Sequence, residues 1–191
     1  MTKYITQEEG NHLITTARKA IEAHLKGDEM PALDLAGVSP VLKEMGASFV
    51  TLTINRMLRG CVGSIEATQP LIKDVQARAV GAAFNDPRFP PLRPEEYPGV
   101  EVEVSRLTPP VKLEYSTPEE LIDRLRPGID GVILSYQFRR ATFLPQVWDQ
   151  LPDPELFLGR LCLKMGLASS TWQTDQMGVE TYQVEKFSEG D

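Results

Sequence analysis

The residues best suited to chemistry lie in one short stretch, Leu58–Ser64, with the sequence Leu-Arg-Gly-Cys-Val-Gly-Ser. It combines a permanent cation, a thiol, a hydroxyl and two glycines in what otherwise reads as a β-strand. Because side chains alternate between the two faces of a strand, Arg59, Cys61 and Gly63 are expected to share one face. Glycines within a strand often mark a bulge, or a place where a ligand or another backbone comes close. Leu58–Ser64 is therefore a candidate binding or catalytic site.

Cys61 is a candidate catalytic nucleophile, because a nearby guanidinium favours the thiolate form of a cysteine. The cation expected on its own face is Arg59, two positions away. A nucleophilic thiol also needs a base to accept its proton, yet the two histidines, His12 and His24, lie on a predicted helix far away in the sequence. The alternative is that Cys61 is a small buried apolar residue, as free cysteines often are. Both readings remain open at this point.

Arg59 is the stronger candidate for binding. A guanidinium is a rigid fork of donors that matches a carboxylate or a phosphate, and a half-buried one normally has an anionic partner. That partner is either a ligand or an internal carboxylate. Glu101 and Glu103, two apart on one face of a predicted strand, are the internal candidates. The residues alone favour neither alternative.

A second polar cluster, Asn85, Asp86 and Arg88, follows directly after an alanine-rich predicted helix. Asn85 and Asp86 are typical of chain turns, whereas Arg88 stands beside Phe89 in a proline-rich loop, from which it can extend over the preceding hairpin. Together with the first stretch, these residues define the predicted ligand-binding set: Arg59, Gly60, Gly63, Ser64, Asn85, Asp86, Arg88 and Glu103.

Composition argues against several classes of function. No apolar run approaches the ~20 residues needed to cross a bilayer, and the net charge of −7 argues against binding to nucleic acid, which depends on a basic surface. Two cysteines provide no disulfide framework, so a reducing, cytoplasmic location is expected. With two histidines and no Cys-x-x-Cys, a zinc site is not expected, and no cofactor is predicted.

Hydrophobic periodicity and capping signals predict the helices. Thr6 and Glu9 form a capping box for a helix over residues 6–27, which Gly27 ends. Further helices are expected to begin at Pro70, after Thr117 and after Asp153. Alternation with period two predicts a hairpin, a strand, a second hairpin and a last strand. These four segments cover residues 47–65, 100–106, 131–144 and 179–187.

The order strand, turn, strand, helix, strand occurs twice, over residues 47–107 and 131–187, without matching residue identities. It predicts an α+β fold with two similar units sharing one mostly antiparallel, curved sheet, to which the N-terminal helix 6–27 is an addition. A Rossmann or P-loop fold is not expected, because no glycine-rich phosphate loop follows a strand.

Several motifs of the chain resemble those of the AMMECR family. The Leu-Arg-Gly-Cys-Ile-Gly-Thr motif of the family is matched by Leu58–Ser64, with Val62 in place of Ile and Ser64 in place of Thr. The similar segments beyond it lie at residues 85–92, 103–105, 126–131 and 142–148. The resemblance covers nearly the whole chain. It implies a single domain over residues 1–191, in which two repeats surround one barrel-like sheet.

The resemblance implies no established activity. In prokaryotes, proteins of this family are encoded beside Memo-like proteins and radical-SAM enzymes, which implies a shared pathway or complex. Two functions of different classes are therefore expected. One is binding of a small anionic ligand in a cleft at Leu58–Ser64, with an enzymatic role left open. The other is a non-catalytic interaction module that acts with Memo-like and radical-SAM partner proteins.

Overall fold

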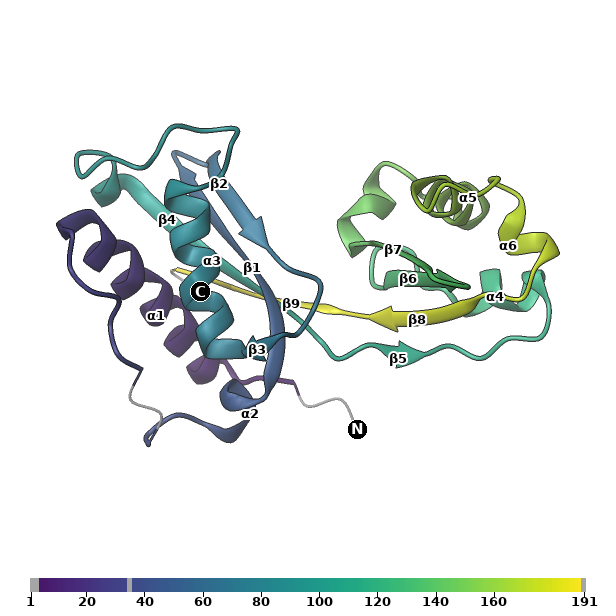
Figure 1. Cartoon of the computed structure of the whole chain (residues 1–191), viewed down its shortest axis with the longest axis horizontal. Coiled ribbons are helices and arrows are strands. Elements are labelled where there is room, and N and C mark those ends of the chain that lie inside the picture. The colour runs from purple at the N-terminus through teal and green to yellow at the C-terminus, as the bar shows by residue number, and fades with distance from the viewer. Residues whose placement is uncertain (1–3, 34–35, 190–191) are drawn as a thin grey trace. The chain divides into compact units, whose positions relative to one another are not determined.

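Two β-sheets, each in its own unit, organise the chain (Figure 1). The computed structural model describes residues 4–33 and 36–189. One unit comprises the described residues up to Thr108 and those from Glu185 onward, and the other comprises Pro109–Val184. Each unit has its own cluster of buried apolar side chains.

The first unit begins with helix α1 (Gln7–Lys26), whose two ends are specified locally. The Thr6 hydroxyl accepts a hydrogen bond from the Glu9 N–H, and the Glu9 carboxylate accepts one from the Thr6 N–H. Gly27 ends the helix with a φ of 74°, a conformation that glycine adopts without steric cost. The helix predicted over residues 6–27 is therefore confirmed.

The sheet of the first unit has the strand order β2-β1-β4-β9, with the short β3 paired to β1. Its strands are β1 (Met45–Ile54), β2 (Met57–Gly63), β3 (Gln69–Pro70), β4 (Val100–Leu107) and β9 (Val184–Ser188). The connections contain the short helix α2 (Pro40–Lys43), helix α3 (Leu71–Phe84) and a 3₁₀ turn at Tyr97–Gly99. Strand β2 is thus an edge strand of this sheet.

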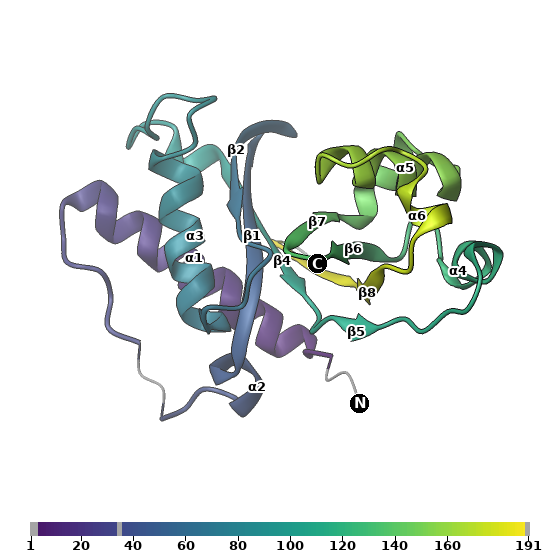
Figure 2. The same ribbon diagram turned by 45° about the vertical axis from the view of Figure 1, so that its right-hand side comes forward.

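Helices α1 and α3 cover one face of this sheet (Figures 1 and 2). Alternate residues of the two central strands, Val50 and Leu52 in β1 and Val102 and Val104 in β4, belong to the core beneath these helices and are almost fully buried. The residues between them, including Thr51 and Glu103, are only partly buried. The predicted alternation of β1 and β4 is therefore confirmed, with one apolar and one polar face.

The glycines of β2 make room for atoms of the protein itself. A Cβ on Gly60 would lie 2.1 Å from the carbonyl oxygen of Ala82 in α3, and a Cβ on Gly63 would lie 2.2 Å from the ring of Phe49. Real Cβ atoms do not approach other atoms so closely, so both positions require glycine. The packing does not support the prediction that these two glycines leave space for a ligand.

The sheet of the second unit has the strand order β5-β8-β6-β7. Its strands are β5 (Val111–Lys112), β6 (Gly131–Tyr136), β7 (Arg139–Phe143) and β8 (Gly178–Tyr182). Its helices are α4 (Pro118–Arg124), α5 (Pro154–Lys164) and α6 (Thr171–Thr174), with a 3₁₀ turn at Pro145–Asp149. Thr117 and Asp153 cap α4 and α5 through their side chains, as their positions predict.

The two sheets stand in place of the single barrel-like sheet that the sequence led us to expect. Pro109 and Pro110 follow β4 and have no N–H, so the ladder of the first sheet cannot continue through them. Val111 then pairs with Thr181 in the other sheet. The single strand expected at residues 179–187 is likewise two strands, β8 and β9, in different sheets.

Period-two alternation identifies strands but not their partners, which is why the pattern did not separate the two sheets. Three strands of each sheet have the same order and connection, β2-β1-β4 in one and β7-β6-β8 in the other. The internal repeat itself remains a prediction.

We predict that Gly60→Ala destabilises the protein, because the new methyl group would collide with the backbone of α3. The expected loss in the free energy of unfolding is about 2 kcal/mol or more, as for other overpacked cores. Urea unfolding followed by circular dichroism measures it. Gly99→Ala is the matched control, since the nearest atom to its Cβ is 3.7 Å away, an ordinary contact. Equal stability of the two variants would contradict the packing assigned to Gly60.

Candidate functional site

Arg59 occupies a bulge in the edge strand β2. Leu52 of β1 pairs with Gly60, but the next residue, Thr53, pairs with Leu58, so Arg59 is the extra residue on β2. A bulge interrupts the alternation of side chains and redirects the inserted residue. The prediction that Arg59 and Cys61 share one face by simple alternation therefore does not apply at this position.

The guanidinium of Arg59 is paired with a carboxylate of the same unit. Its Nε donates to Glu96 Oε1 at 2.9 Å and its Nη2 to Glu96 Oε2 at 3.2 Å, and Nη2 also donates to the carbonyl oxygen of Pro90 at 2.9 Å. Arg59 hydrogen bonds, together with a backbone N–H bond from Arg93, lower the pKa of Glu96 from 4.5 to about 2. Arg59 is thus mostly buried and held by a two-point ion pair.

Glu96 replaces both carboxylates that were expected as internal partners of Arg59. Glu101 instead accepts a hydrogen bond from the Thr53 hydroxyl, and Glu103 accepts one from the Ser105 hydroxyl. Both lie on strand β4, separated from β2 by β1. Glu96 lies in the loop between α3 and β4, a segment in which no periodicity or motif signals a contact with Arg59.

One donor of Arg59 has no acceptor. The Nη1 atom is buried, and it is the one buried side-chain nitrogen or oxygen of the described residues that lacks a hydrogen-bond partner. A buried cationic donor without an acceptor is costly. The centre of the Phe89 ring lies 6.0 Å from the guanidinium carbon of Arg59 and 5.5 Å from that of Arg88, so both guanidinium groups lie close to one aromatic ring.

Asp86 and Arg88 cap the outer edge of β2 at Cys61. The N–H of Cys61 donates to Asp86 Oδ2 at 2.9 Å, and the Cys61 carbonyl oxygen accepts from Arg88 Nη2 at 3.2 Å. Arg88 also donates through Nε and Nη2 to the Asp86 carboxylate, at 2.9 and 2.7 Å. The side-chain bonds from Arg88, aided by the N–H of Cys61, hold the pKa of the buried Asp86 well below its usual range despite burial.

Cys61 lies in a row of polar side chains across the sheet. Thr51 of β1 pairs with Cys61 on one side and with Glu103 of β4 on the other, and the Thr51 hydroxyl donates to Cys61 Sγ at 3.3 Å. Because the Cys61 N–H bonds to Asp86, Cys61 and Thr51 form a non-hydrogen-bonded pair, in which side chains approach most closely. The thiol is half-buried, whereas Cys162 is fully buried in α5 and burial raises its pKa.

The structure therefore brings together five predicted site residues: Arg59, Gly60, Cys61, Asp86 and Arg88. Ser64 lies at the end of β2, where its hydroxyl donates to the Glu66 carbonyl, and Asn85 is an exposed residue at the C-terminus of α3. Glu96 and Thr51 are the contacts that sequence reasoning missed. The register of the predicted hairpin could have identified Thr51, because it lies opposite Cys61.

The described residues form no group of three or more His, Cys, Asp or Glu side chains that could hold a metal ion. None of the helices in the described ranges is both long and apolar enough to span a bilayer. One pocket of about 300 Å³ in the first unit is lined by residues of α1 and α3, among them His12, Lys19 and Gln76, and by residues 31–33 and Gly37. It does not include Leu58–Ser64.

We predict that Glu96→Gln lowers the free energy of unfolding by about 2 kcal/mol at pH 7, the usual value of a charged hydrogen-bonded pair. Because the folded pKa of Glu96 is lowered, its contribution is present above pH 4.5 and is lost as the pH falls toward about 2. The stability difference between the two proteins should therefore shrink over that window. Urea unfolding at pH 7, 4 and 3 measures it.

The control is Glu95→Gln, which removes one exposed carboxylate beside Glu96 and should change stability little at any pH. A stability difference for Glu96→Gln that stayed constant down to pH 3 would show that the carboxylate charge is not what stabilises the pair.

Comparisons with known proteins agree with the AMMECR motifs found in the sequence. A profile of the AMMECR1 family matches residues 14–187. A protein of Methanothermobacter thermautotrophicus is 38% identical over 186 residues, covering 97% of this chain and 96% of that protein. Protein MJ0810 of Methanocaldococcus jannaschii is 36% identical over 194 residues, covering 98% and 93%.

A solved structure extends the similarity to the fold. The crystal structure of Uncharacterized Protein PH0010 from Pyrococcus horikoshii matches with a TM-score of 0.78 and 36% identity, over 97% of this chain and 94% of that one. The family match spans both units, and the relatives match over nearly their full length. The chain therefore belongs to the AMMECR1 family.

Proposed function

We propose that the protein binds a small anionic ligand beside β2, at Arg59 and Arg88. The observation that carries this proposal is the buried Nη1 of Arg59, a cationic donor without an acceptor among the described residues. An oxygen of a bound anion would supply that acceptor. Glu96 and the Pro90 carbonyl oxygen occupy the other donors of the guanidinium, so the ligand takes one donor and not the whole fork.

The balance of charge around β2 also favours an anion. The loop after α3 and the bulge bring together three guanidinium groups, those of Arg59, Arg88 and Arg93, and two carboxylates, those of Asp86 and Glu96. One positive charge is left over. The side chain of Arg88 is about half exposed, at 55%, so it remains accessible to a ligand while Asp86 fixes its position.

Cys61 and Thr51 would form the neighbouring wall of the site. The Thr51 hydroxyl donates a hydrogen bond to Cys61 Sγ, and the half-buried thiol would be the nucleophilic group of this wall. Glu103 lies in the same row, on the other side of β1, and adds a carboxylate to that face of the sheet. The catalytic role of Cys61 remains a prediction.

We predict that pyrophosphate or citrate binds, and that Glu96→Gln tightens binding about tenfold, because it frees the fork of Arg59 for the anion. Arg88→Met should weaken binding by a similar factor. Isothermal titration calorimetry at low salt measures both effects. Arg56→Met, which removes an exposed arginine in the turn before β2, is the control for general loss of positive charge.

Two results would overturn the anion proposal. The first is that neither the parent protein nor Glu96→Gln binds any anion. The second is that Arg56→Met weakens binding as much as Arg88→Met, which would indicate a diffuse attraction and not a site.

Docking of a partner protein is the second candidate, favoured by apolar side chains exposed around the same edge strand. Met57, Leu58 and Ile65 are 68%, 43% and 43% exposed. Exposed apolar residues that lie close together, such as the consecutive Met57 and Leu58 at the start of β2, often mark an interaction surface. Memo-like and radical-SAM proteins are the partners that the family resemblance implies.

For this alternative, we predict that Leu58→Asp abolishes co-purification of the protein with a Memo-like or radical-SAM partner, because a carboxylate would be buried at the interface. Ile129→Asp in the second unit, where Ile129 is 51% exposed, should leave the complex intact. A complex that survives Leu58→Asp together with Met57→Asp would exclude this edge as the docking surface.

A further inference from the structure

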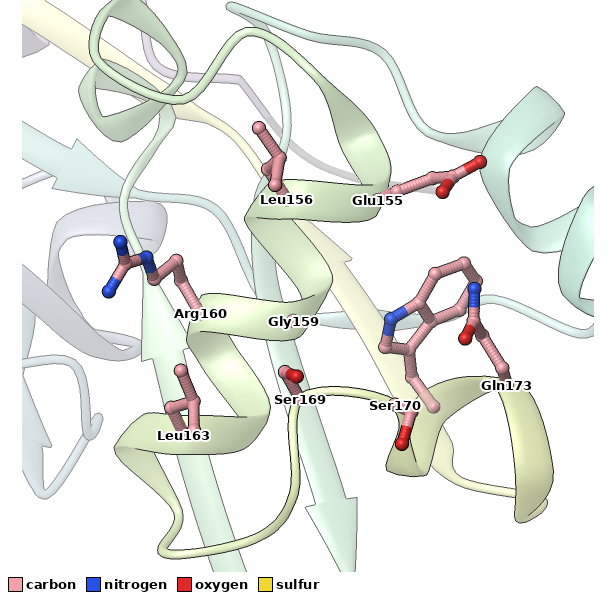
Figure 3. A pocket seen from close by; sticks show the side chains of 9 residues that line it. Glu155, Leu156, Gly159, Arg160, Leu163, Ser169, Ser170 and Gln173 are labelled. Carbon is pink, nitrogen blue, oxygen red and sulfur yellow. The ribbon is translucent and has the colours of Figure 1, made fainter.

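A second concave site lies entirely within the second unit, away from every residue of the anion site in sequence. It has a volume of about 450 Å³ and is formed by one face of α5 and the 169–173 segment. Figure 3 shows Gly159 on α5 at its centre, with Leu156 and Leu163 along the helix and Ser169 and Gln173 on the facing segment. This volume falls within the range of small-molecule pockets.

Helix α5 presents an apolar surface that the core does not use. Leu156, Gly159, Arg160 and Leu163 follow the spacing of one helix face and line the pocket. Leu156 is 61% exposed and Leu163 is 49% exposed. The opposite face of the helix supplies the core of the unit through Phe157, Leu158, Leu161 and Cys162. The two exposed leucines therefore form a surface on which the apolar part of a ligand can pack.

The facing segment contributes hydrogen-bond donors without partners. Trp172 lines the pocket and is only 3% exposed, yet its indole N–H is hydrogen-bonded to no other described residue. The contrast is Trp148, whose indole N–H donates to the Asp130 carbonyl oxygen at 2.7 Å. The Trp172 indole nitrogen is not among the buried side-chain atoms without a partner, so solvent reaches this N–H although most of the side chain is buried. An oxygen of a ligand can therefore take the place of water at this donor.

The polar side chains around the pocket are also unoccupied. Ser169, Gln173, Arg160 and Glu155 form no side-chain hydrogen bond or ion pair with other described residues. Figure 3 shows the side chains of Arg160 and Glu155 at opposite margins of the pocket. The side chains that can donate a hydrogen bond therefore outnumber those that can only accept one. The one carboxylate of the pocket, that of Glu155, lies at the margin opposite Arg160.

We propose that this pocket binds a small amphipathic carboxylic acid. The apolar chain of the ligand packs on Leu156 and Leu163, and its carboxylate accepts hydrogen bonds from the Trp172 indole N–H and the Ser169 hydroxyl. Arg160 rotates about its long, flexible side chain to pair with the same carboxylate. A carboxylate is the ligand group that fits, because it only accepts hydrogen bonds and so matches a set of free donors.

The test uses the two tryptophans of the chain as an internal comparison. In ¹⁵N-labelled protein each gives one indole N–H signal in a proton–nitrogen NMR spectrum, and hydrogen exchange distinguishes the bonded signal of Trp148 from the free one of Trp172. Titration with hexanoate should shift the Trp172 signal in a saturable manner, with a dissociation constant on the order of 1 mM for so small a ligand. The Trp148 signal should stay in place.

Four further titrations assign the contacts. Hexanamide, which lacks the charge, and acetate, which lacks the chain, should each bind roughly tenfold more weakly than hexanoate. Arg160→Met should reduce hexanoate binding to the level of hexanamide. Lys73→Met, which removes a cation from an exposed position of helix α3, should change nothing.

The proposal fails if hexanoate leaves the Trp172 signal unmoved. It also fails if the parent protein binds hexanoate no more tightly than hexanamide and Arg160→Met binds hexanoate as tightly as the parent protein does. An equal response of both indole signals would indicate a general effect of solvent and would also overturn it. Because no residue is shared with the site beside β2, these outcomes are independent of whether pyrophosphate or citrate binds there.

Discussion

An edge strand leaves every second backbone N–H and C=O without a partner, and β2 is such a strand. At Cys61 the need is met by side chains: the carboxylate of Asp86 accepts from the backbone N–H, and the guanidinium of Arg88 donates to the carbonyl oxygen. The two side chains act together as a short substitute for a neighbouring strand. Asp86 and Arg88 reach Cys61 only because the segment after α3 folds back onto β2. The rest of the site depends on this contact between the segment and the strand.

The position of the loop is fixed at both of its ends. At one end, the absence of a side chain on Gly60 lets α3 lie against β2, so that the helix delivers Asp86 to the edge of the sheet. At the other end, the bulge at Arg59 directs a guanidinium to Glu96 and to the carbonyl oxygen of Pro90. The loop is thus bound to the strand by the Arg59–Glu96 ion pair and by the hydrogen bonds of Asp86 and Arg88 to the backbone of Cys61, while the Arg88–Asp86 ion pair lies within the loop.

Sequence reasoning succeeded where the signal was local. The caps at Thr6, Thr117 and Asp153 and the alternation of β1 and β4 need only neighbouring residues, and each is present. It failed where the outcome depends on distant groups. Arg59 pairs with Glu96, in an irregular loop, and not with Glu101 or Glu103. The bulge redirects the Arg59 side chain, and β1 lies between β2, which carries Arg59, and β4, which carries both glutamates. The separation of β8 from β9 likewise depends on which strands meet, and alternation carries no information on pairing.

The place of β9 in the chain has a consequence for the order of folding. Strand β9 belongs to the first sheet but follows the whole second unit in sequence, so the second unit is an insertion in the first. Phe187 of β9 packs on Gly10 of α1, and Glu185 pairs with Arg106 of β4. During synthesis on the ribosome, the inserted unit has all its residues available before the first unit has its last strand. Part of the apolar surface of α1 therefore stays uncovered until β9 has been synthesised.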